Sequence, residues 1–291
     1  MTGRSLTEVS AASTIRAARS GSLPRRPAPG PRSRLWAIRT PVPRPWRRGF
    51  IAASVLVPLL AWTLLSTSGI VPGRFLPSPL AVGSALVEMT RSGQLVGDAA
   101  ASLERVVVGF GLAVLISVPL GILMGAFAAG RALLEPAIGL LRYLPASAFI
   151  PLLIIWLGLG EPSKIVLLVI GVVFFNTLMT ADAVRAVPMD VIDVSYTLGA
   201  RRGEVLRKVV IPHALPGMID SMRVNSAAAW NFVVVAELIA STSGLGYRIV
   251  RSQRFLETDK IFAVLVVIGL IGLTIDVGLR LLRERLGRWQ P

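Results

Sequence analysis

The stretch "DVSYTLGARRGEVLRKVVIPHALP", Asp193 to Pro216, is the part of this sequence that most constrains its fold. It carries five charged residues between Arg201 and Lys208, so it must lie in water or against a polar partner. The chain around it is 53% hydrophobic with a mean hydropathy of +0.68, and long apolar runs stand on both sides of the stretch. The sequence therefore places a basic, water-facing segment between two apolar segments.

The apolar runs are about 20 residues long, which is the length that an α-helix needs to cross the hydrocarbon core of a membrane. They are continuous rather than alternating with polar residues, which excludes a membrane β-barrel. We therefore expect an all-α polytopic membrane protein. Pro145 and Pro151 lie within the third span and are expected to bend it. The six expected transmembrane helices cover residues 49–67, 106–128, 133–158, 164–181, 217–241 and 261–282.

Composition limits the chemistry of the chain. It has no cysteine and one histidine, His213, so disulfides, thiolate chemistry and a multi-histidine metal site are excluded, and we expect no metal site. The net charge of +15 raises the question of nucleic-acid binding, but 11 arginines lie within residues 1–48, which are rich in Pro, Ser and Ala. We interpret residues 1–48 as a disordered, basic cytoplasmic tail that contacts anionic lipids, and residues 49–291 as the transmembrane domain.

The distribution of arginine predicts the orientation in the membrane, because basic loops stay on the cytoplasmic side. The basic tail, the loop with Arg131 and Arg142, the 193–216 segment and the C-terminal "RLLRERLGRWQP" are all expected inside. An even number of spans then places both termini in the cytoplasm. The loops expected outside cover residues 68–105, 158–163 and 242–260.

The 193–216 segment and the residues just before it contain local signals for two short helices. Met189 to Leu198 can form the first helix, and Gly199 can supply a left-handed stop. Ala200 to Val210 can form the second, which we expect Ile211 and Pro212 to end. Two short helices around a glycine corner, held at both ends by membrane spans, would form a rigid protruding segment that a soluble partner can bind.

The same segment resembles the "EAA" motif of ABC importer permeases, whose pattern is E-A-A-x3-G-x9-I-x-L-P. "DVS" (193–195) stands at the E-A-A positions, Gly199 matches the glycine, and "VVIP" (209–212) matches the I-x-L-P end with its spacing kept. The acidic residue is retained, whereas both alanines are replaced. In that family this loop binds a cytoplasmic ATPase. The resemblance thus implies that the loop at 189–216 couples to an ATPase through Asp193, Gly199, Ala200, Arg201, Arg202, Glu204, Ile211 and Pro212.

Further stretches resemble the subfamily that imports sulfonates, taurine, nitrate and related small molecules: "RFLPSPLAV" (74–82), "LPASAFIPLLIIWLGLGEPSKI" (144–165), "WNFVVVAELIASTSGLGY" (230–247) and "RFLETD" (254–259). The resemblance implies the type I ABC importer permease fold, a permease homodimer in the bacterial inner membrane, and an extracytoplasmic binding protein that delivers the solute.

The chain contains no G-x4-G-K-[ST] phosphate loop, so we expect it not to be an enzyme. The resemblance places ATP and its magnesium on the partner ATPase, with no cofactor in this chain.

Ionisable residues at membrane depth are costly and usually functional. Arg223, Trp230 and Glu237 are seven residues apart, so they share one helix face, which should point into the bundle or the dimer seam. Arg223 can also pair with Asp220, three residues earlier. Our candidates for the translocation path are Arg223, Trp230, Asn231, Glu237 and Asn176, with helix-to-helix hydrogen bonding as the alternative role for Asn176.

Arg248, Arg251 and Arg254 are three residues apart in a loop that is expected outside, against the general rule for positive charge. We hypothesise that they attract an anionic substrate or an acidic patch on the binding protein. Contact with lipid headgroups is the alternative.

Another class of protein also remains compatible with these spans. A self-contained secondary transporter or channel would need a proton relay, paired broken helices or a ring of charge, for which the sequence offers scattered candidates.

Overall fold

The computed structural model describes residues 42–287, and all regular secondary structure in this range is helical. The chain divides into two units, one ending at Ala61 and the other beginning at Trp62. Helix α2 (Arg44–Thr67) begins in the first unit and starts before the expected boundary at residue 48. Most of the predicted tail lies outside the described residues.

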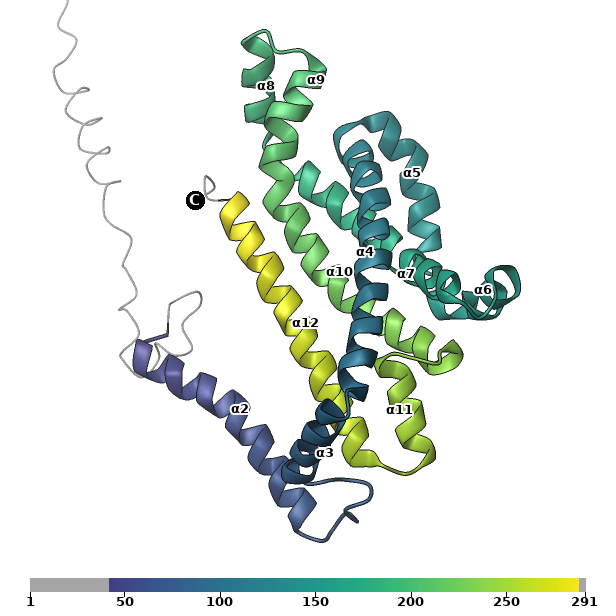
Figure 1. Ribbon diagram of the computed structural model, residues 1–291. Helices are drawn as coiled ribbons and strands as arrows, with labels where there is room; N and C mark the ends of the chain where they lie inside the picture. The colour runs from purple at the N-terminus through teal and green to yellow at the C-terminus, as the bar shows by residue number, and fades with distance from the viewer. Residues whose placement is uncertain (1–41, 288–291) are drawn as a thin grey trace, which may run out of the picture. The chain divides into compact units, whose positions relative to one another are not determined.

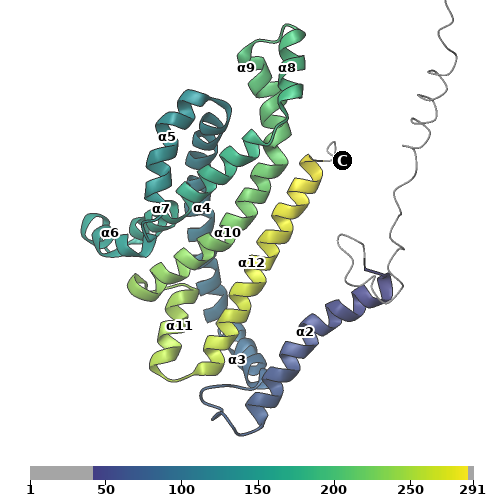
Figure 2. The same cartoon turned by 180° about the vertical axis from the view of Figure 1, so that it is seen from behind.

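The second unit contains the remaining helices, and its long helices run between two ends (Figures 1 and 2). Helices α8 and α9 lie at one end, which we call the α8–α9 end. Helices α3 and α11 lie at the other, the α3–α11 end. The elements are α3 (Pro79–Arg91), α4 (Gln94–Ala126), α5 (Ala128–Leu141), η2 (Ala146–Phe149), α6 (Ile150–Leu157), α7 (Glu161–Arg185), α8 (Met189–Thr197), α9 (Arg202–Val205), η3 (Leu206–Val210), α10 (Ile211–Ala240), α11 (Leu245–Arg254) and α12 (Thr258–Leu286).

Four of the described helices are long and apolar enough to cross a membrane: α2 from Trp46, α4, α7 and α12. A bent pair, Ala128–Leu141 with Ala146–Leu157, makes five if it counts as one span. The expected count of six is therefore not reached. The missing span is α10, which is 30 residues long but carries Asp220, Arg223, Asn225, Asn231 and Glu237, which lower its hydropathy.

The third expected span is broken rather than straight. Its two halves meet at an angle of 79°. Pro145 has the φ of −65° that its ring imposes and an extended ψ of 117°, so the helical geometry is interrupted at this residue. The expected bend is therefore present at Pro145. Pro151 instead lies in the first turn of α6, where a missing N–H is tolerated.

Helices α4 and α7 pack with their backbones close together, and glycines of α4 make this possible. A Cβ atom added at Gly121 would lie 2.5 Å from Thr180 Cβ, and one at Gly125 would lie 2.7 Å from the carbonyl oxygen of Ala181. Gly111, on the same helix, has no atom within 4 Å of such a position. The glycine-rich face of α4 is thus the packing face, as expected for membrane helices.

Candidate coupling and translocation sites

The corner between α8 and α9 depends on Gly199, whose φ is +83°, in the left-handed region. The N–H of Gly199 donates to the carbonyl of Tyr196 (2.9 Å), and the N–H of Ala200 donates to that of Ser195 (3.1 Å). These bonds satisfy carbonyl groups at the end of α8 that would otherwise lack partners. The predicted helix from Met189 and its left-handed stop are both confirmed.

Glu204 caps the start of α9. Its carboxylate accepts a hydrogen bond from the N–H of Arg201 (3.1 Å) and pairs with the Nζ of Lys208 (3.1 Å). The backbone N–H of Arg201, followed by Lys208, lowers the pKa of Glu204 below its ordinary value of 4.5. The carboxylate is therefore ionised throughout the neutral range, and the cap does not change with pH there.

The second short helix does not end at Ile211 and Pro212, contrary to our expectation. It continues through a π-helical turn, Leu206–Val210, directly into α10. In a regular α-helix the ring of Pro212 would collide with the carbonyl of Lys208. The wider turn avoids this, since the N–H of Ile211 donates to Leu206, five residues back. Helix α9 is thus continuous with α10.

None of the residues of α8 is buried, although several are apolar. Leu198, directly after α8, is 82% exposed, and Val194 and Tyr196 are also exposed. Asp193, Arg201 and Arg202, among the predicted coupling residues, are exposed as well. The α8–α9 corner therefore presents a surface of exposed apolar and basic side chains.

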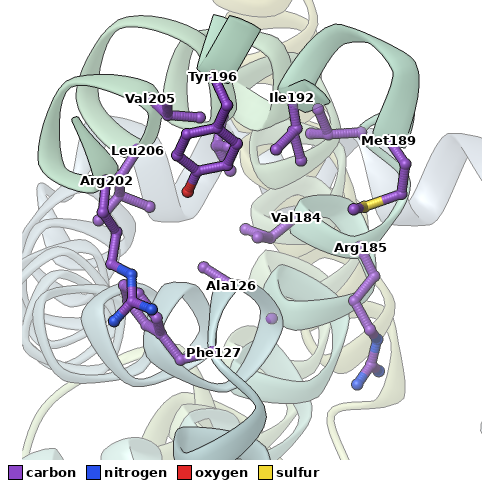
Figure 3. Close-up of a pocket in the computed structure, with 13 residues that line it drawn as sticks. Ala126, Phe127, Val184, Arg185, Met189, Ile192, Tyr196, Arg202, Val205 and Leu206 are labelled. Atoms are coloured by element: carbon purple, nitrogen blue, oxygen red, sulfur yellow. The ribbon is translucent and has the colours of Figure 1, made fainter. Parts of the chain in front are cut away.

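The corner is anchored to the bundle by a compact apolar cluster, which consists of Val184, Val187, Val205, Val210, Ala214 and Met218. Beside this cluster lies a cavity of about 200 Å³. Figure 3 shows the hydroxyl of Tyr196 pointing into this cavity and Arg202 reaching beside Phe127. The Cζ of Arg202 lies 5.9 Å from the centre of the Phe127 ring, a cation–π arrangement between α9 and the end of α4.

Arg223, a candidate for the path, lies in an ion-pair network between α10 and α12. Its guanidinium pairs with Asp220 (3.1 Å) and Asp276 (3.0 Å), and Arg283 pairs with Asp220 (2.7 Å). The predicted Asp220–Arg223 pair is present. The partners on α12 were not anticipated, because the sequence does not show which helices are neighbours.

Asn176 and Trp230 lie in the packed core of the bundle. Asn176 is fully buried, donates to the hydroxyl of Ser117 (2.6 Å) and accepts from Asn225 (3.2 Å), which joins α4, α7 and α10. Trp230 is buried in the largest apolar cluster. Both side chains are buried between helices, and the hydrogen bonds of Asn176 are those that the helix-to-helix alternative describes.

The predicted face with Arg223, Trp230 and Glu237 does point into the bundle. The exposed residues of α10 are Val224, Ala227, Asn231, Leu238 and Ile239, and three of them, Val224, Asn231 and Leu238, lie one position further on and are again spaced by seven. Asn231 is the polar residue of this exposed face, and among the candidates for the path it is the one whose exposure fits that role.

Glu237 is 1% exposed and lies in what we call the Arg105 network, at the α3–α11 end. Arg105 Nη1 lies 2.6 Å from Glu237 Oε1, and the other side of the guanidinium binds both oxygens of Glu161 (2.6 and 2.8 Å). The network comprises Asp98, Ser102 and Arg105 of α4, Glu161 and Lys164 of α7, Glu237 of α10 and Arg248 of α11.

The network also fixes the start of α11. Glu237 accepts from the N–H of Gly246 (2.8 Å), the hydroxyl of Ser102 accepts from Leu245 (2.8 Å), and Asp98 accepts from Gly244 (3.0 Å). These are the N–H groups that a helix start leaves without internal partners. Sequence analysis missed the members from α4 and α7. The spacing of Asp98, Ser102 and Arg105 on one helix face was a signal, but we interpreted residues 68–105 as an outer loop.

Arg248, which we hypothesised to attract an anion together with Arg251 and Arg254, is buried. It is 7% exposed, and its guanidinium pairs with Asp98 (2.6 Å) and Gln94 (2.8 Å). Residues three positions apart on an α-helix point in directions that differ by about 60°, so Arg248 and Arg254 point about 120° apart. Arg251 and Arg254 are exposed and line a pocket of about 350 Å³ between α10 and α11.

Within residues 42–287 no group of three or more His, Cys, Asp or Glu side chains is arranged to hold a metal ion.

Comparison with known proteins identifies the class. Residues 117–288 match the family model described as "Binding-protein-dependent transport system inner membrane component". The chain is 37% identical to a protein of Brucella abortus (strain 2308) named "Probable ABC transporter permease protein", over 83% of this chain and 96% of that protein. This chain belongs to the family of ABC importer permeases, the non-catalytic membrane components of binding-protein-dependent transport systems.

Two further relatives have names that refer to a solute. The taurine transport system permease protein TauC of Escherichia coli (strain K12) is 36% identical, over 81% of this chain and 88% of TauC. The protein of Bacillus subtilis (strain 168) named "Putative aliphatic sulfonates transport permease protein SsuC" is 31% identical, over 95% of this chain and 98% of that protein. A solved structure of the MetNI methionine ABC transporter in an inward-facing conformation has a TM-score of 0.61 at 20% identity, over 68% of this chain and 98% of that chain. That likeness concerns the fold.

Proposed function

We propose that this permease forms the translocation path of an ATP-driven importer and couples to a cytoplasmic ATPase through the loop at 189–216. The observation that carries this proposal is the α8–α9 corner, which is exposed, apolar and basic, and held in one shape by Gly199. An exposed apolar surface on a rigid element is typical of a protein-binding site. Because α9 continues into α10, a displacement of the corner would move a helix of the membrane bundle.

The proposed partners follow from the family. An ATPase subunit would bind ATP and magnesium, an extracytoplasmic binding protein would deliver the solute at the α3–α11 end, and a second copy of the permease would complete the path. The exposed Val224 and Asn231 of α10 support such a dimer interface, because an asparagine at this depth needs water or another chain to bind. The protein would lie in the bacterial inner membrane, with both termini in the cytoplasm.

The proposed solute is a small oxyanion such as a sulfonate, taurine or nitrate. Names of relatives refer to taurine and aliphatic sulfonates, and two exposed arginines at the α3–α11 end suit an anionic solute. A self-contained secondary transporter is less well supported, because Glu237, its best candidate for proton coupling, is held by Arg105, Ser102 and Gly246.

The test compares two glycines of the same loop. Gly199→Val forces a branched side chain into a left-handed conformation, which costs about 1–2 kcal/mol or more at that position. Gly203→Val adds the same atoms at a position without positive φ and with no atom within 4 Å of the added Cβ. The change at Gly199 should abolish ATP-dependent uptake in proteoliposomes while the membrane domain stays folded, and the change at Gly203 should preserve most of it. Normal uptake and normal ATPase stimulation with Gly199→Val would refute the proposal.

A further inference from the structure

We propose that the pocket between the end of α10 and α11 is an anion-binding site that takes the oxyanion head of a short organic solute, a sulfonate or a carboxylate. The pocket has a volume of about 350 Å³ and is lined by Arg251, Arg254, Tyr247 and apolar side chains that include Leu238 and Val250. That volume is in the range of small-molecule sites. That the ligand is a transported solute rests on the proposed function. The presence of an anion-binding site does not depend on that function.

The charge of the surroundings supports an anion. Arg105, Lys164 and Arg248 at this end of the molecule each lie within 4 Å of a carboxylate, so their charges are neutralised locally. Within residues 42–287, by contrast, no carboxylate lies within 4 Å of the guanidinium of Arg251 or Arg254. Two guanidinium groups three residues apart on one helix therefore contribute a positive potential to the pocket that the described chain leaves unbalanced.

Glu237 also borders the pocket, but its charge does not cancel this potential. Its oxygens are engaged by Arg105, the hydroxyl of Ser102 and the N–H of Gly246, and its side chain is fully buried. The Arg105 network therefore keeps the carboxylate of Glu237 from pairing with Arg251 or Arg254.

The lining fits an oxyanion on a short carbon chain. A guanidinium binds a sulfonate or carboxylate through two parallel N–H donors, and Tyr247 can add a hydroxyl donor. The apolar walls would contact the carbon chain. The phosphate of an anionic lipid shares this chemistry, so the experiment must separate a dissolved solute from a lipid headgroup.

The absence of cysteine in this chain permits a direct measurement. Leu238→Cys places a single thiol at the pocket, in full-length permease in nanodiscs of phosphatidylcholine. The labelling rate is measured with a sulfonate-bearing and with a trimethylammonium-bearing methanethiosulfonate. Each labelling rate is divided by the rate of the same reagent with free 2-mercaptoethanol. The normalised rate of the anionic reagent, divided by that of the cationic reagent, reports the local electrostatic potential, because both reagents attack the same thiolate.

At low ionic strength the ratio should favour the anionic reagent, and it should fall about fivefold or more when Arg251 and Arg254 are both changed to Gln. Both residues are exposed, so these changes leave the core intact. Arg91→Gln removes an exposed arginine at the end of α3 and should leave the ratio unchanged. Millimolar methanesulfonate should slow the labelling in the protein with both arginines and not in the double variant.

Several results would overturn the proposal. These are an absence of labelling by either reagent, a ratio that does not depend on Arg251 and Arg254, or protection by added phosphatidylglycerol or by a binding protein but not by methanesulfonate. The measurement needs no ATPase. A failure of ATPase coupling and a failure of this site would therefore be seen separately.

Discussion

At the scale of single residues, the best-defined chemistry of the molecule is the Arg105 network. It brings three cations and three carboxylates together at the α3–α11 end, largely out of contact with solvent. Burying charges costs free energy, which close pairing and additional hydrogen bonds must offset. The network therefore works as a unit, and the loss of one member leaves its partner buried without compensation.

This reasoning predicts the effect of Asp98→Asn. Arg248 would keep a buried guanidinium without a carboxylate, which should lower the free energy of unfolding by about 3–5 kcal/mol. Glu88→Gln is the matched control, because Glu88 is exposed and its pair with Lys260 spans 3.6 Å, so it should cost at most about 1 kcal/mol. Thermal unfolding of the purified chain in detergent would measure both. Equal midpoints for the two variants would show that the network contributes no stability.

Some residues could be placed from the sequence and others could not. The left-handed conformation of Gly199 and the pairing of Asp220 with Arg223 are local, since their partners lie within a few residues. The burial of Arg248 and Glu237 depends on Asp98 and Arg105, which lie more than 100 residues away in sequence. A single sequence does not show that α4 reaches these partners, so Glu237 was assigned to the translocation path and Arg248 to the attraction of an anion.

At the scale of helices, the close packing of α4 against α7 determines how tightly the bundle is held. Gly121→Ala would place a methyl group 2.5 Å from Thr180 Cβ, so one helix must move, at a cost of about 1–3 kcal/mol. Gly111→Ala on the same helix adds the same atom in open space and should be neutral or slightly stabilising. Unfolding midpoints in detergent would test the pair. If Gly121→Ala is as stable as Gly111→Ala, the described contact between α4 and α7 is wrong.

Hydropathy predicted the most apolar helices and was less successful for the others. It located α7 and α12 to within a few residues. It treated residues 133–158 as one span, although the break at Pro145 divides them, and the proline rule wrongly ended the second coupling helix at Pro212. In both cases a proline signalled a change in backbone geometry, but its local effect depended on hydrogen bonds that hydropathy does not describe.

At the scale of the whole membrane unit, α10 connects the two functional ends. Its first turn continues from the π turn behind the α8–α9 corner, and Glu237 near its last turn belongs to the Arg105 network that holds α11. The Ser117–Asn176–Asn225 hydrogen bonds join α10 to α4 and α7 between these ends. This connectivity gives a physical route by which binding at the corner could affect the anion pocket.

The family and its all-helical fold could be predicted from the spacing of Gly199 and Pro212 together with the apolar runs. The polarity of α10 could also be seen in the sequence, but its meaning required the structure. The polar residues that lower its hydropathy are mostly satisfied by α4, α7 and α12, whereas Asn231 remains exposed.

The measurement that tests the central claim most directly is affinity purification of the full chain from its native membranes in mild detergent, followed by mass spectrometry. We expect a soluble ATPase with a phosphate-binding loop to co-purify with the unmodified chain and with Gly203→Val. The same ATPase should be lost with Gly199→Val, because the α8–α9 corner would no longer keep its shape. Recovery of a homo-oligomer without an ATPase from the unmodified chain would contradict the account.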